Sequence, residues 1–191
     1  MAREVYPADD LTYTDAELVT LLRAGDVEAM SQLVDRWSPA MFRVARSFVG
    51  SPQSAEDVVQ DAWLGMLRGL ARFEGRSSLR AWTFTILVNQ ARTRGAREAR
   101  TVPKPDLEYG AGEPPKTPEG VMLGKEVLLQ VDRALSALPP RQRQVVTMRD
   151  VCGMTAEEVC AALGISPTNQ RVLLHRARAA LRPALAEYYR S

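Results

Sequence analysis

Apolar residues recur every three or four positions along most of the chain, and alternating runs of β-branched residues do not occur. This spacing is typical of amphipathic α-helices and predicts an all-α protein. Four helices are predicted before residue 100: one from Thr14 or Asp15 to Gly25, one from Asp26 to Gly50 that Pro39 interrupts or kinks, one from Ser51 to about Leu70, and one from Ser77 or Ser78 through Ala91.

Residues 101–120 break this pattern. The stretch TVPKPDLEYGAGEPPKTPEG holds five of the twelve prolines and three of the twelve glycines, without periodic apolar positions. Such a segment of roughly 20 residues is too long for an ordinary loop inside one compact domain. It therefore predicts a linker, which divides the chain into two helical domains, 14–100 and 121–190.

The second domain begins with a predicted helix over 121–138 and a further helix, RQRQVVTMRDV, that ends before Gly153. Thr155 and Glu158 then have the spacing of a capping box, Gly164 marks a tight turn, and Ser166-Pro167 starts a last helix that Pro183 ends or kinks. Residues 155–182 thus predict a helix-turn-helix. Its interior is expected to consist of Val159, Leu163, Ile165, Val172, and Leu173 or Leu174.

The second helix of this motif places short polar groups and arginine near its start, with more arginine one or two turns later. This order is typical of a helix that lies in the major groove of DNA. The candidate residues are Thr168, Asn169, Arg171, His175, Arg176 and Arg178. A helical hairpin with a solvated basic face is the plainer interpretation, and this segment alone leaves it open.

Charge is unevenly distributed along the chain. The net charge is only +2, yet 68–100 carries eight arginines against two glutamates, and 164–191 carries five arginines against one glutamate. Residues 1–30 have the opposite sign, with seven acidic and two basic side chains. Because local charge sets the field that a phosphate backbone meets, the two basic segments favour nucleic acid. The acidic start is either a solvated face or a brake on DNA binding.

The segment 73–100 mixes arginine with aromatic residues. Its arginines could contact phosphates and its aromatic rings could stack on bases. The residues concerned are Phe73, Arg76, Arg80, Trp82, Phe84, Arg92, Arg94 and Arg97. Trp82 and Phe84 cannot both face one side of a helix, so a structural role for either ring remains equally possible.

A third surface is acidic. The stretch SAEDVVQDAWLGML places Asp57, Gln60, Asp61 and Trp63 or Leu64 on adjoining helical turns. A polar stripe edged by a large apolar side chain suits a protein partner, although a solvated helix face would look the same.

Several classes of function are disfavoured. No run of 18 apolar residues occurs, and the start MAREVYPADD lacks the features of a secretory signal, so a cytoplasmic protein is expected. Two cysteines and one histidine predict neither a disulfide framework nor a metal site. With no phosphate loop, HExxH or GxSxG motif, we expect no cofactor and no catalytic residue. A further C-terminal domain is not expected.

In combination, SAEDVVQDAW, FEGRSSLRAWTFTILVNQAR, the proline-rich gap, ALSALPPRQRQVV and the helix-turn-helix ending LLHRARAALR resemble a bacterial RNA polymerase sigma factor of the extracytoplasmic-function group. The resemblance covers 14–100 and 121–187. It implies a region 2-like domain and a region 4-like domain joined by a flexible linker. It also implies binding to core RNA polymerase and promoter DNA, and control by an anti-sigma factor.

The resemblance further implies roles for individual residues. The polymerase clamp would be bound by Asp57, Gln60, Asp61, Trp63 and Leu64. The −10 element would be melted and read by Arg76, Ser77, Ser78, Arg80, Trp82, Asn89, Arg92 and Arg94, with Arg76, Ser77 and Ser78 holding a flipped base and Asn89 contacting the non-template strand. The −35 duplex would be read by Thr168, Asn169, Arg171, His175, Arg176 and Arg178. Here Thr168-Asn169-Gln170, Val172 and Leu173 depart from the family's pattern, which leaves the preferred bases open.

A conventional helix-turn-helix regulator with an N-terminal helical partner domain is the alternative. It accounts for 155–182 equally well. It does not account for two segments suited to DNA on either side of a proline-rich linker.

Overall fold

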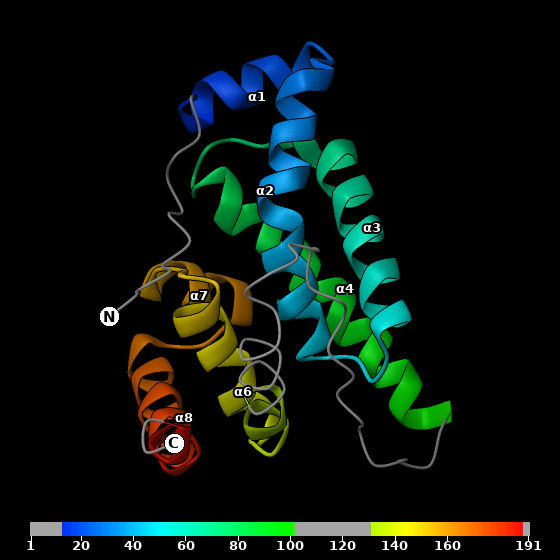
Figure 1. The fold of residues 1–191 in the computed structure, drawn as a ribbon. Helices are drawn as coiled ribbons and strands as arrows, with labels where there is room; N and C mark the ends of the chain where they lie inside the picture. Colours follow the sequence, from blue (N-terminus) through cyan, green and yellow to red (C-terminus); the bar gives the residue numbers. More distant parts are fainter. Residues whose placement is uncertain (1–12, 102–130, 189–191) are drawn as a thin grey trace, which may run out of the picture.

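The computed structural model describes residues 13–101 and 131–188, and every regular element in these ranges is a helix (Figure 1). The elements are α1 (Asp15–Arg23), α2 (Val27–Arg46), α3 (Pro52–Gly69), η1 (Leu70–Arg72), α4 (Leu79–Thr101), α6 (Pro140–Val146), η2 (Thr147–Val151), α7 (Ala156–Leu163) and α8 (Pro167–Tyr188). The all-α prediction is confirmed. Apart from Thr101, the predicted linker 101–120 lies outside the described residues. Within these ranges, no helix has both the length and the apolar character needed to cross a bilayer.

The predicted helix starts of the first domain are confirmed by side-chain caps. Thr14, Asp26 and Ser51 each accept a hydrogen bond from a backbone N–H of the first helical turn that follows. In addition, Asp15 accepts a hydrogen bond of 2.7 Å from the backbone N–H of Leu79, so α1 helps to cap α4. Part of the acidic start therefore serves to begin helices.

Aromatic packing and close helix approach hold α2, α3 and α4 together. The rings of Trp37 and Trp63 stack with centroids 6.2 Å apart, and Phe84 of α4 is completely buried. At Gly95, a Cβ atom would lie 2.5 Å from the backbone oxygen of Phe48, so only glycine permits this contact between α4 and the end of α2.

Neither Pro39 nor Pro183 ends its helix, so an interruption of the helix at either proline is wrong. Helix α2 continues through Pro39, and α8 continues past Pro183 to its end at Tyr188. A proline inside a helix loses one backbone hydrogen bond and strains the preceding turn. In α2, the buried face formed by Leu33, Trp37 and Met41 runs along both sides of the exposed Pro39. Burial of this face offsets the local cost.

The second domain contains the predicted helix-turn-helix. Thr155 and Glu158 form both hydrogen bonds of the capping box, and Gly164 ends α7 in the left-handed conformation at φ 63°. The preceding helix does not run through to its predicted end, because α6 gives way to the π-helical turn η2. That turn ends with a 2.9 Å hydrogen bond from the N–H of Cys152 to the carbonyl of Thr147.

The interior of the motif matches expectation except at one position. Val159, Leu163 and Leu174 are buried, whereas Ile165 and Leu173 are partly buried. Val172 is 42% exposed, so its predicted place in the interior is wrong. A shift of two positions along a helix turns a side chain by about 200°, which separates Val172 from the buried Leu174.

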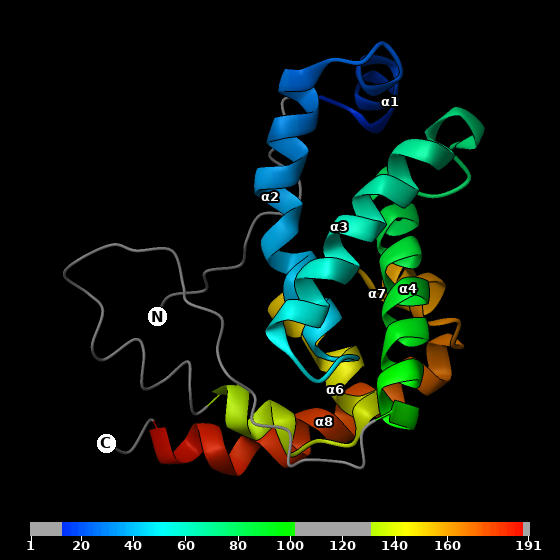
Figure 2. The ribbon, with the colours of Figure 1, turned by 90° about the vertical axis from the view of Figure 1, so that its right-hand side faces the viewer.

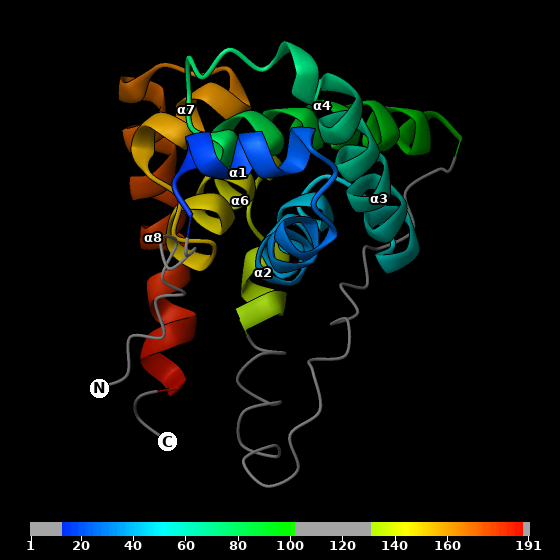
Figure 3. The same cartoon turned by 90° about the horizontal axis from the view of Figure 1, so that it is seen from above.

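The two domains are in contact. Helix α7 packs against α4, and η2 packs against α2. As Figures 1 and 3 show, the unit of α6, α7 and α8 lies on one side of α2 and α4, and α3 lies on the other side. Figure 2 shows the same arrangement from the α3 side, with α6 and α8 across the lower end of the bundle. The outer face of α3 is therefore remote from the second domain.

Candidate nucleic-acid interface and partner surface

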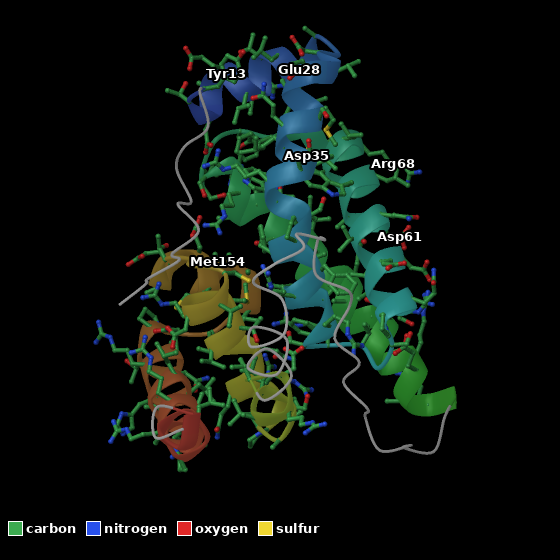
Figure 4. All side chains as sticks on the ribbon, in the orientation of Figure 1. Tyr13, Glu28, Asp35, Asp61, Arg68 and Met154 are labelled. Atoms are coloured by element: carbon green, nitrogen blue, oxygen red, sulfur yellow. The ribbon has the colours of Figure 1, made fainter. Side chains whose placement is uncertain are left out.

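The outer face of α3 presents polar, acidic and apolar groups together. Gln60 and Asp61 are exposed, and the neighbouring Leu64 and Leu67 are 48% and 44% exposed. Figure 4 shows Asp61 and Arg68 on the side of α3 that faces away from α2. Leu67 was not recognised in the sequence, although it stands three positions beyond Leu64 and so shares its face.

Trp63 does not belong to this face. Its side chain is 8% exposed, it stacks on Trp37, and its indole N–H donates to the hydroxyl of Ser38 over 3.2 Å. Of the two alternatives that the sequence left open, Leu64 therefore provides the exposed apolar edge.

Asp57 and Arg94, which were expected to face different partners, form an ion pair with each other. Arg94 donates to Asp57 and to Glu98, each over 3.1 Å, and both members of the Asp57–Arg94 pair are half-buried. Burial alone would raise the pKa of Glu98, but hydrogen bonds from Ser54, the Gly50 N–H and Arg94 outweigh it and lower the pKa. This network ties α3 to α4 and partly occupies both side chains.

The loop before α4 is exposed. Arg76, Ser77 and Ser78 are all exposed, and Arg76 forms an ion pair with Glu74, two positions before it. The Ser78 hydroxyl also accepts a hydrogen bond of 3.1 Å from the N–H of Ala81, which caps α4. The loop is thus fixed at Ser78, where α4 begins, while the hydrogen-bond donors of Arg76 and Ser77 are accessible to solvent.

The aromatic residues of this segment are largely used by the fold. The rings of Trp82 and Phe73 lie 5.0 Å apart, and Trp82 also covers Gly69, where a Cβ atom would lie 3.0 Å from the indole ring. Phe84 is in the core. Asn89 lies five positions after Phe84 on the same helix, and its polar side chain is exposed.

Arg80 is held by the second domain. Its side chain is 13% exposed, and it donates over 2.8 Å to the carbonyl of Cys152. It also lies 3.5 Å from a carboxylate oxygen of Glu158, and its guanidinium stands 5.5 Å from the centre of the Phe84 ring. Ser78 donates to the same carboxylate over 3.3 Å. Two residues predicted to face the −10 element therefore bind the helix-turn-helix.

Arg92 makes a similar contact. It donates a hydrogen bond to the carbonyl of Leu163, at the end of α7. Burial and the nearby positive charge of Arg141 lower its pKa. A cavity of about 240 Å³ at this domain junction is lined by Phe48, Arg92, Gly95, Ala96, Pro140, Arg141 and Gln144.

The second helix of the motif, α8, has an accessible basic face. The exposed candidates are Thr168, Asn169, Arg171, His175 and Arg176. Arg178 differs, because it forms a two-point ion pair with Asp150 at 2.8 and 2.7 Å. The hydrogen bond to Asp150 raises the pKa of Arg178. This arginine secures α8 to η2 within the domain.

The fold raises the pKa of both cysteine thiols. Cys152 is buried, and burial raises its pKa to about 11. The pKa of Cys160 is also raised, by burial and by the charge of Glu157. In the described residues, no three His, Cys, Asp or Glu side chains gather in a way that could hold a metal ion.

Comparison with known proteins agrees with the two-domain arrangement. Residues 33–101 match the family model of Sigma-70 region 2, and residues 128–181 match that of Sigma-70 region 4. Together these matches cover more than half of the chain. They place most of α2 and all of α3 and α4 in the first region, and α6, α7 and most of α8 in the second.

The chain is also similar to complete proteins. It is 30% identical over 177 residues to an ECF RNA polymerase sigma-E factor of Escherichia coli, which covers 88% of this chain and 92% of that protein. Among solved structures, it is similar to CnrH in complex with the cytosolic domain of CnrY, with a TM-score of 0.65, 27% identity, and 91% and 97% of the two chains covered. It is also similar to the sigma factor RpoE of Bartonella quintana in complex with the anti-sigma factor NepR, with a TM-score of 0.60, 26% identity, and 84% and 98% covered. The chain therefore belongs to the extracytoplasmic-function group of RNA polymerase sigma factors.

Proposed function

We propose that this sigma factor divides promoter recognition among three surfaces. The outer face of α3 binds core RNA polymerase, the loop and first turns of α4 capture the −10 element, and α8 reads the −35 duplex. The observation that carries the proposal is the pairing of an exposed polar and apolar face on α3 with an exposed basic face on α8, in a chain that matches sigma regions 2 and 4.

The proposed polymerase surface consists of Gln60, Asp61, Leu64 and Leu67, with Asp57 at its edge. Exposed leucines surrounded by polar groups favour a protein partner, because their burial stabilises a complex while the rim remains solvated. Trp63 supports this face from below by packing on Trp37.

A triple variant tests this surface. Asp57→Asn, Gln60→Ala and Asp61→Asn together should lower affinity for core RNA polymerase at least tenfold, measured by interferometry with immobilised polymerase. Asp35→Asn is the matched control, because it removes an exposed carboxylate from α2 (Figure 4). Unchanged affinity in the triple variant, with an unchanged melting temperature, would count against the assignment.

The proposed −10 surface consists of Arg76, Ser77, Ser78 and Asn89, joined by Arg80 and Arg92 when α7 leaves α4. Capture of a melted strand needs pockets and donors for unstacked bases and cations for phosphates. Trp82 is packed against Phe73, so we assign it a role in shaping this surface. Arg94 adds little positive charge to this surface, because its guanidinium is already paired with Asp57 and Glu98.

The proposed −35 surface consists of Thr168, Asn169, Arg171, His175 and Arg176. A helix-turn-helix reads base edges with the first turns of its second helix, and the arginines beyond them contact phosphates. We assign Arg178 to a lesser role in DNA binding, because Asp150 already holds it.

Two further parts of the proposal follow from the family. The protein works in the cytoplasm with RNA polymerase, which supplies the chemistry, and the chain itself has no catalytic residue. An anti-sigma factor, like the NepR bound to Bartonella RpoE, would cover the α3 face and α8. The triple variant should then lose affinity for that factor as well as for the polymerase.

Run-off transcription with purified core polymerase tests the whole proposal. The chain should direct initiation from a subset of promoters in a genomic library, and their shared upstream elements would define the −35 and −10 sequences. A conventional helix-turn-helix regulator would leave core polymerase inactive and would act only on a complete holoenzyme. That result would refute the proposal.

A further inference from the structure

Val172 is one of four large apolar side chains that remain strongly exposed in the described residues, at 42%. Its neighbours Leu173 and Leu174 turn towards the core, as do Gln170 and Ala177. An exposed valine in this position has no partner in the fold to explain it.

The buried side of α8 fixes where Val172 points. Since successive residues of a helix are separated by about 100°, Val172 lies on the opposite side of α8 from Gln170, Leu174 and Ala177. Thr168, His175 and Ala179 are exposed and lie along the same outer row. Val172 is thus near the middle of the face that is directed away from the domain.

This outer row is the part of the helix suited to enter a groove. Val172 is the sixth residue of α8, within its first two turns, where the second helix of the motif contacts base edges. Arg171 and Arg176 are exposed on either side of the row. A basic rim around an apolar centre suits a ligand that is anionic at its edges and apolar at one point.

Duplex DNA offers one such apolar point in its major groove. The C5-methyl of thymine projects there, whereas the other exposed atoms of the base edges are mainly hydrogen-bond donors and acceptors. Val172 has only methyl groups to offer and can distinguish bases only by this contact.

We infer that Val172 selects a thymine in the −35 element by packing its methyl groups against the C5-methyl of that base. The inference rests on the proposed function, because it assigns a base preference to α8 within the duplex that this helix reads. It also explains how a position without hydrogen-bonding groups can contribute to sequence recognition.

Deoxyuridine substitution tests this contact by removing one thymine methyl group at a time. Each thymine of the −35 duplex, taken from the promoters found by run-off transcription, is replaced singly by deoxyuridine, which removes one methyl and keeps every hydrogen-bonding group. Affinity is measured with the full chain bound to core polymerase. One position should lose affinity about threefold to fourfold, as one buried methyl group predicts.

Variants at position 172 connect this loss to the side chain. Val172→Ala should bind the thymine duplex more weakly and should no longer respond to deoxyuridine at that position, which is the non-additivity expected of a direct contact. Val172→Thr keeps one methyl and should retain part of the response. Val27→Ala is the matched control, because it shortens a more exposed valine on α2 and should leave the full response.

The outcomes separate the inference from the proposed function. If the holoenzyme prefers the −35 duplex over a scrambled one but responds to no deoxyuridine, or if Val172→Ala responds as wild type does, the inference is wrong and the proposed function stands. If the holoenzyme does not distinguish the two duplexes, the proposed role of α8 fails and the inference fails with it. Since Val172 is exposed, Val172→Ala should melt at the wild-type temperature, which confirms that it is folded.

Discussion

On α8, the side chains of Asn169, Arg171 and Arg176 are exposed to solvent. At the start of α4, by contrast, the Arg80 side chain is only 13% exposed and is bound to the second domain. Arg92 is likewise held by the end of α7. Both segments are rich in arginine, and both are proposed to contact the promoter. They differ in whether their arginine side chains are already hydrogen-bonded to another part of the protein.

This difference agrees with the two kinds of DNA that the segments are proposed to bind. A duplex has its base edges in place before the protein arrives, so a preformed helix face such as α8 can read it directly. A melted strand exists only after the promoter duplex has opened. Until then, the side chains that bind it can make contacts within the protein. On this proposal, Arg80 and Arg92 would contact DNA only after α7 has moved away from α4.

The largest effect is expected from Phe84, the fully buried aromatic ring of the 73–100 segment. Phe84→Ala should lower the free energy of unfolding by about 3–5 kcal/mol, because it removes a fully buried ring and leaves a cavity. Urea denaturation measures the loss. Asn89→Ala, on the exposed side of the same helix, should change stability by less than about 0.5 kcal/mol. A loss below about 1 kcal/mol for Phe84→Ala would show that this ring is not a core residue.

The next largest effect separates the two proposed DNA surfaces. Arg176→Ala should weaken binding of the holoenzyme to the −35 duplex by about 1–3 kcal/mol, the range for loss of a two-point contact with a base. Asn89→Ala should leave that binding unchanged and impair promoter opening, which permanganate reactivity at the −10 element detects.

Arg178→Ala serves as the control on the same helix. Because Arg178 is already paired with Asp150, its loss should weaken duplex binding less than the loss of Arg176 does. If Asn89→Ala and Arg176→Ala reduce binding to intact duplex equally, the two surfaces do not divide the work as proposed.

Much of the fold follows from local sequence, and the exceptions have physical causes. Caps such as Ser51 and the Thr155–Glu158 box act within four residues, so their spacing reveals them. The contact between Arg80 and Glu158 joins residues 78 positions apart, and no local pattern encodes it. Val172, Leu173 and Leu174 are adjacent apolar residues whose directions differ by about 100° each, and only packing decides which of them face inward.

A smaller effect is expected from loosening the contact between the domains. Glu158→Gln removes the charge that faces Arg80 but keeps an acceptor at the third helical position, so the capping box of α7 is retained. Affinity for single-stranded −10 DNA should rise by up to about fivefold, since loss of this ion pair with Arg80 is worth up to about 1 kcal/mol. Fluorescence anisotropy with a labelled strand measures the change.

The control for this variant lies on the same turn. Glu157→Gln removes an equal charge from an exposed position of α7 and should leave affinity for the strand unchanged. If Glu158→Gln binds the strand no better than this control does, Arg80 is not withheld from DNA by the second domain.

The smallest effect concerns the carboxylate that shares Arg94 with Asp57. Hydrogen bonds from Ser54, Gly50 and Arg94 lower the pKa of Glu98 below its ordinary value of 4.5, despite the opposing effect of burial. The charged form therefore stabilises the fold, and this stabilisation is fully present above the pKa of the unfolded chain and is lost as the pH falls through the pKa of the folded protein.

Glu98→Gln should accordingly lower the free energy of unfolding at pH 7 by about 1 kcal/mol or less, as is usual for a partly exposed ion pair. The difference from wild type should shrink as the pH falls below 4.5, because protonation then removes the same charge from wild type. Denaturation at a series of pH values measures this, with Glu74→Gln in the exposed loop as a control that should show no difference at any pH. A difference that persists unchanged to pH 3 would mean that the side-chain amide disturbs packing between α3 and α4, and that the charge of Glu98 does not hold Arg94.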